Sequence, residues 1–158
     1  MEKELRRRQS ILSVTGNGVL FLGMWSFLKV NLYFILGRSS LLRDMADENI
    51  DEGTMLLILY IGSMIFASFE LFLRICIRRS AIAESKGQKQ KPGYIRLTIF
   101  LIILYSASII YSVFSLKLNS ANVWDQIASL MVDITSLLMM VELAGAARFI
   151  QRYQDYST

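Results

Sequence analysis

Four long apolar blocks determine what this chain of 158 residues can fold into. They cover about residues 11–36, 55–77, 95–116 and 123–149. Each block is long enough for an α-helix to cross a hydrocarbon core of roughly 30 Å at about 1.5 Å per residue. The single proline, Pro92, lies between two of the blocks. We therefore predict an all-α, polytopic membrane protein in which residues 1–158 form one domain, a bundle of four transmembrane helices.

The distribution of lysine and arginine indicates how these helices are oriented. Thirteen of the seventeen basic residues lie at the two ends of the chain or in and beside the connection 78–94. The connection 37–54 is acidic instead, with Asp44, Asp47, Glu48, Asp51 and Glu52. Because basic residues accumulate on the cytoplasmic side, we expect both termini and the basic loop 78–94 to be cytoplasmic and the loop 37–54 to face outward.

The first block raises the question of a signal peptide, because Lys3 and Arg6–Arg8 precede it. The block is too long for the apolar region of a signal peptide, so we interpret it as a retained helix. The compactness of the chain favours a bacterial inner membrane as its location.

A short internal similarity suggests that the helices form two duplicated hairpins. Leu28–Asn31 resembles Leu116–Asn119 at an offset of 88 residues, and Glu-Leu occurs at Glu70 and again at Glu142. Parallel repeats of this kind occur in transporters. Chance is the alternative, since apolar helices match one another easily.

The composition argues against an enzyme. One cysteine, Cys76, cannot form an intrachain disulfide, and the absence of histidine removes most zinc sites and the usual general base. No phosphate-binding glycine loop or metal-ligand cluster is visible, and the connections are too short for a soluble catalytic domain. We expect no catalytic residue, no metal and no cofactor. The basic loop suits anionic membrane lipids better than nucleic acid.

Ionisable residues within the blocks are the main functional candidates, because a charge at the centre of a membrane helix costs about 2.5–3.5 kcal/mol on insertion scales. Asp133 is the deepest, and Lys29 lies at a similar depth, which suggests an ion pair between them. Lys29 snorkelling to the outer interface is the alternative. Glu70 has Arg74 one turn along the same helix, which favours a pair within that helix.

The remaining acid, Glu142, follows Asp133 by nine residues, so the two side chains point to opposite sides of their helix. This arrangement suggests self-association, with one acid inside the bundle and the other facing a neighbouring chain. The small residues Ala144–Ala147 beside Glu142 would permit another helix to approach closely. Asn17, at a matching depth in the first block, is a candidate hydrogen-bond partner of Glu142.

Small and hydroxyl residues at heptad spacing predict the inward helix faces. The third block carries the longest such stripe: Thr98, Leu101, Tyr105, Ser108, Ser112 and Ser115. The second and fourth blocks carry Ser63, Ala67, Glu70 and Arg74, and Ser129, Asp133, Ser136 and Met140. These faces either line a polar path or simply pack the helices together.

Two functional hypotheses follow from these features. The first is a small channel or transporter that acts as a homo-oligomer, with Asp133 as the coordinating group and Glu70 and Glu142 lining the inner half of the path. The second is a non-catalytic accessory or regulatory subunit that docks on a larger membrane protein through Glu142 and the small residues beside it.

Overall fold

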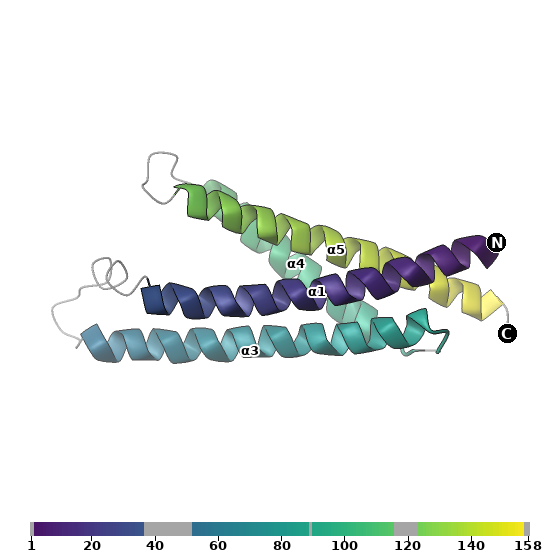
Figure 1. Cartoon of the computed structure of the whole chain (residues 1–158), viewed down its shortest axis with the longest axis horizontal. Helices are drawn as coiled ribbons and strands as arrows, with labels where there is room; N and C mark the ends of the chain where they lie inside the picture. Colours follow the sequence, from purple (N-terminus) through teal and green to yellow (C-terminus); the bar gives the residue numbers. More distant parts are fainter. Residues whose placement is uncertain (1, 37–51, 89, 116–122, 157–158) are drawn as a thin grey trace. The chain divides into compact units, whose positions relative to one another are not determined.

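The structure is a computed structural model that describes residues 2–36, 52–88, 90–115 and 123–156. This part of the chain forms four helices: α1 (Glu2–Leu36), α3 (Glu52–Ser85), α4 (Gly93–Phe114) and α5 (Val123–Tyr156) (Figure 1). All four are long and apolar enough to cross a membrane. The predicted all-α fold with four such helices is confirmed.

Three helices are longer than the apolar blocks that predicted them. α1 begins at Glu2, α3 continues to Ser85 and α5 continues to Tyr156. Glutamate, glutamine, lysine and arginine are good helix formers, so these helices continue where the apolar stretch ends. In α1 the i,i+4 pair of Glu4 and Arg8, with Nε 3.0 Å from Oε1, supports this extension. Apolar length therefore underestimates helix length here.

The connection between α3 and α4 is correspondingly shorter than the predicted loop 78–94. Helix α3 ends at Ser85, and the backbone turns at Gly87, whose φ of 83° suits glycine. The amide of Gly87 donates to the carbonyl of Glu84 at 2.9 Å. Pro92 then precedes the first turn of α4, a favoured place for proline. Most of the predicted outer loop, 37–51, lies outside the described residues.

The chain divides into two compact units. Unit 1 contains residues 1–22 and 75–158, and unit 2 contains residues 23–74. The boundaries fall inside α1, after Leu22, and inside α3, after Arg74. Nothing in the sequence predicted this division.

Unit 1 has a core made by all four helices, and its buried residues recur at alternating steps of three and four. In α5 they are Ser136, Met140, Leu143, Ala147 and Ile150; in α4, Tyr94, Thr98 and Leu101; in α3, Ile77, Ala81 and Glu84; and in α1, Leu12, Thr15 and Val19. This heptad spacing is typical of left-handed helix packing. Glycine allows close approach, since a Cβ at Gly16 would lie 3.3 Å from the Cβ of Ala81.

Unit 2 is a pair of antiparallel helix segments, Gly23–Leu36 of α1 and Glu52–Arg74 of α3, which run side by side (Figure 1). A Cβ at Gly23 would collide with the side chain of Arg74, so glycine provides the space for that arginine. Towards the other end, the rings of Phe34 and Tyr60 meet edge to face at 5.3 Å. The hydroxyl of Tyr60 also donates to Asn31 Oδ1 at 3.4 Å.

Candidate functional site

Asp133 and Glu142 of α5 lie in different environments within unit 1. Asp133 is half-buried, whereas Glu142 is exposed. The step of nine residues from Asp133 to Glu142 places their side chains on opposite sides of the helix. A carboxylate exposed within an apolar helix face is expensive in a bilayer, which makes Glu142 a candidate contact for another molecule.

Glu70 of α3 forms the ion pair with Arg74 that was predicted within this helix. Arg74 Nε donates to Glu70 Oε1 at 2.8 Å. The arginine side chain is fully buried, while that of Glu70 retains 19% of its exposure. This pair sits at the end of unit 2, where Gly23 makes room for it. The charge of Glu70 is thus balanced by its own helix.

Lys29 is exposed and belongs to unit 2, whereas Asp133 belongs to unit 1. The ion pair proposed between them would therefore join the two units. It stays a prediction.

Asn17 was predicted to form a hydrogen bond with Glu142, but its side chain forms two other hydrogen bonds. Asn17 Oδ1 accepts from Arg78 Nε at 2.9 Å, and Asn17 Nδ2 donates to the carbonyl of Ser13 at 3.1 Å. The first bond joins α1 to α3 inside unit 1. The long side chain of Arg78 reaches Asn17 across the interface between the two helices.

The hydroxyl stripe of α4 changes its environment along the helix. Thr98 and Leu101 are buried, Tyr105 and Ser112 are half-buried, and Ser108 and Ser115 are exposed. The buried end packs against the rest of unit 1, and the hydroxyl of Thr98 donates to the carbonyl of Tyr94 at 2.8 Å. The fully buried part of the stripe therefore lies in its first half.

The small residues beside Glu142 face mostly inward. Ala144, Ala146 and Ala147 are buried, and only Gly145 is exposed. Of the small residues proposed as a docking patch, only Gly145 is therefore accessible to another helix. The alanines instead allow α5 to pack closely inside unit 1.

A buried polar cluster in unit 1 was not predicted. Glu84 of α3 is fully buried, and one of its carboxylate oxygens, Oε2, accepts a hydrogen bond from the hydroxyl of Tyr94 of α4. Its other oxygen, Oε1, and Nε2 of Gln151 of α5 are also buried, and the Gln151 side chain is a neighbour of the Glu84 carboxylate. The sequence placed Glu84 in a loop, so its burial was missed. Its heptad spacing after Ile77 and Ala81 was the available signal.

Among the described residues no three cysteine, aspartate and glutamate side chains gather as a metal site would require. The chain matches no known family model, no curated protein and no solved structure. The candidate residues are therefore defined by this chain alone. They are Asp133 and Glu142 on α5 in unit 1 and, as a separate feature, the Glu70–Arg74 pair on α3 in unit 2.

Proposed function

We propose that this protein is a small homo-oligomeric channel or transporter that crosses a membrane with its four helices and has no catalytic role. The observation that carries the proposal is the contrast between Asp133 and Glu142 of α5. Asp133 is half-buried and lies at heptad spacing before the buried residues Ser136 and Met140, where a path would need a charged group. Glu142 is exposed, where a neighbouring copy would need a contact. The cost of charges in a bilayer makes both features unusual for helices that only anchor a protein.

The arrangement of unit 1 supports a topology with both termini in the cytoplasm. The guanidinium of Arg8, near the start of α1, lies 5.3 Å from the centroid of the Phe149 ring, near the end of α5. The two basic ends of the chain thus lie at one end of the unit. The excess of lysine and arginine at these ends favours the cytoplasmic side, and a bacterial inner membrane is the expected location. The origin of the fold in two duplicated hairpins stays part of the hypothesis.

Asp133 is the residue to which we assign the transport role. Acidic side chains along a membrane path favour cations over anions. Glu70 was expected to line the inner half of the path, but Arg74 balances its charge within the same helix. Glu142, on the opposite side of α5, would then contact the neighbouring copy.

The test is the variant Asp133→Asn, which removes the charge and keeps the shape. Purified protein in lipid vesicles is given K⁺, Na⁺ and proton gradients in turn. The wild-type protein should dissipate at least one of them, and Asp133→Asn should abolish that flux while its helical circular dichroism is unchanged. Glu4→Gln, which removes an acid beyond the apolar block, is the matched control and should transport normally. Normal flux through Asp133→Asn would show that the assigned role is wrong.

The exposed acid also fits the second hypothesis, an accessory subunit docked on a larger membrane protein. Glu142 would then pair with a basic residue of that protein. The native mass of the complex extracted in a mild detergent separates the two hypotheses. Several copies of this chain alone support the channel or transporter, and one copy bound to a different polypeptide supports the accessory subunit.

A further inference from the structure

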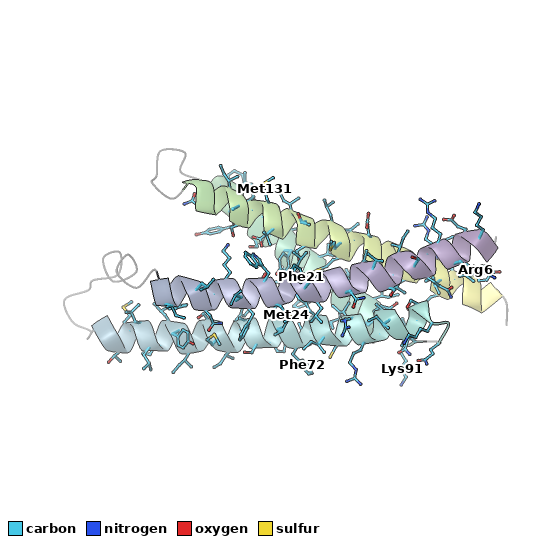
Figure 2. The ribbon with its side chains drawn as sticks, in the orientation of Figure 1. Arg6, Phe21, Met24, Phe72, Lys91 and Met131 are labelled. Carbon is cyan, nitrogen blue, oxygen red and sulfur yellow. The ribbon has the colours of Figure 1, made fainter. Side chains whose placement is uncertain are left out.

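An exposed face of α5 repeats at the same heptad spacing as its buried face. Its members are Met131, Thr135, Leu138, Glu142, Gly145, Phe149 and Arg152, and all are exposed. Figure 2 shows the side chain of Met131 pointing outward from the helix. A second face with the spacing used for packing suits contact with another helix.

Helix α3 has a comparable face. It comprises Ile58, Gly62, Ile65, Phe69, Phe72, Cys76 and Arg79, of which Cys76 is half-buried and the others are exposed. Phe72 also points outward in Figure 2. Each of the two faces therefore combines apolar side chains and one glycine with charge towards the C-terminal end of its helix: Glu142 and Arg152 on α5, and Arg79 on α3.

Within the described part of the chain, nothing packs against the glycines on these faces. A Cβ at Gly145 or at Gly62 would meet nothing within 4 Å, whereas one at Gly16 or Gly18 would meet Ala81 or Met139. Glycine inside a helix costs about 0.5–1 kcal/mol relative to alanine. Such a glycine would allow a helix of another chain to approach α3 or α5 closely.

The charged residues on the two faces are complementary. Glu142 on α5 and Arg79 on α3 are both exposed, and neither has an ion pair or hydrogen bond among the described residues. The chain thus carries both halves of an ion pair that it does not form itself. A second copy can supply the missing half to each.

The two residues also lie at a similar level along unit 1. Both α3 and α5 run antiparallel to α1, so they are parallel to each other: Gly16 faces Ala81 and Gly18 faces Met139. Arg79 comes two residues before Ala81, and Glu142 three after Met139. At about 1.5 Å per residue, Arg79 and Glu142 differ in level by roughly one helical turn or less. The length of an arginine side chain can bridge that difference.

We propose that α5 of one copy packs against α3 of a neighbouring copy, with Glu142 paired to Arg79 and the helices in closest contact at Gly145. The contact joins two different faces, so repeating it produces a ring or an open chain rather than a symmetric dimer. A closed ring would enclose a path. The inference rests on the proposed homo-oligomer and specifies its interface.

The first test is cross-linking between copies in native membranes. Cys76 is replaced by serine, and chains that carry only Arg79→Cys are co-expressed with chains that carry only Glu142→Cys. Mild oxidation should link the two kinds of chain. Chains with Arg96→Cys, an exposed arginine of α4, replace the Arg79→Cys chains in the control and should not link. Equal linking in both experiments, or none in the first, would overturn the interface.

Charge reversal tests the ion pair itself. Glu142→Arg should raise the dissociation constant between copies at least about tenfold, because it places like charges together. Adding Arg79→Glu to the same chain should restore most of the oligomer, measured as its native mass. Failure of the double variant to recover contradicts the pairing.

The native mass of the wild-type protein distinguishes a failure of the proposed interface from a failure of the proposed homo-oligomer. If the wild type is a homo-oligomer but the cysteines do not link, this interface is wrong and the proposed function stands. If the wild type contains one copy, the homo-oligomer and the interface are both wrong.

Discussion

The two units accommodate a carboxylate of α3 in different ways. In unit 2, Glu70 is paired with Arg74, one turn further along the same helix. In unit 1, Glu84 is fully buried and is held by an uncharged group, the hydroxyl of Tyr94 on another helix. The first arrangement is local and needs only α3 to be helical. The second depends on α3 and α4 meeting at the right level, so it reports on tertiary structure.

The largest effect should come from removing the carboxylate in unit 2. Glu70→Gln leaves the buried charge of Arg74 without its compensating acid, which should cost about 3 kcal/mol of unfolding free energy in detergent. The double variant Glu70→Gln/Arg74→Met should recover most of that loss. Hydrogen exchange should show that protection is lost mainly within residues 23–74. A double variant as unstable as the single one would show that the ion pair is not the reason.

A smaller effect is expected in unit 1. Tyr94→Phe removes the donor to Glu84 and leaves a buried carboxylate oxygen unsatisfied, which should cost about 2 kcal/mol of unfolding free energy. Tyr111→Phe is the control, because Tyr111 lies on the same helix with 74% of its surface exposed. In the background Glu84→Leu, the further change Tyr94→Phe should cost much less, since the two residues act together. Additive losses would contradict the hydrogen bond.

The smallest effect concerns the exposed contact that joins α1 to α5. Phe149→Leu keeps an apolar side chain but removes the ring beneath Arg8, which should cost about 0.5–1 kcal/mol of unfolding free energy. Phe114→Leu, at a ring that is 87% exposed, should leave the stability unchanged. Equal effects of the two substitutions would mean that Arg8 gains nothing from the aromatic ring.

The comparison also explains what could be predicted from the sequence. The four helices and the Glu70–Arg74 pair depend on apolar length and on the i,i+4 spacing, both of which are local properties of the chain. The burial of Glu84 and the bond between Asn17 and Arg78 depend on which helices are neighbours, and spacing within one helix carries no such information. Helices α1, α3 and α5 extend beyond the predicted membrane spans because charged helix formers continue a helix beyond its apolar part.

The sequence also left the orientation of small residues undecided. Ala144–Ala147 were expected to face another chain, but in the structure three of them are buried and only Gly145 is exposed. A run of four small residues covers a full turn of helix, so it cannot identify one face. The alternation of buried and exposed residues along α5 provided that information.

The unequal lengths of the helices have a consequence for the bilayer that surrounds them. α1, α3 and α5 contain 34 or 35 residues, about 51 Å of helix, whereas α4 contains 22 residues, about 33 Å. The longer helices can tilt or extend into water when the lipid thickness changes. α4 has almost no length to spare, so in a membrane it would set the hydrophobic thickness that the protein matches, and a thicker bilayer would have to thin around it.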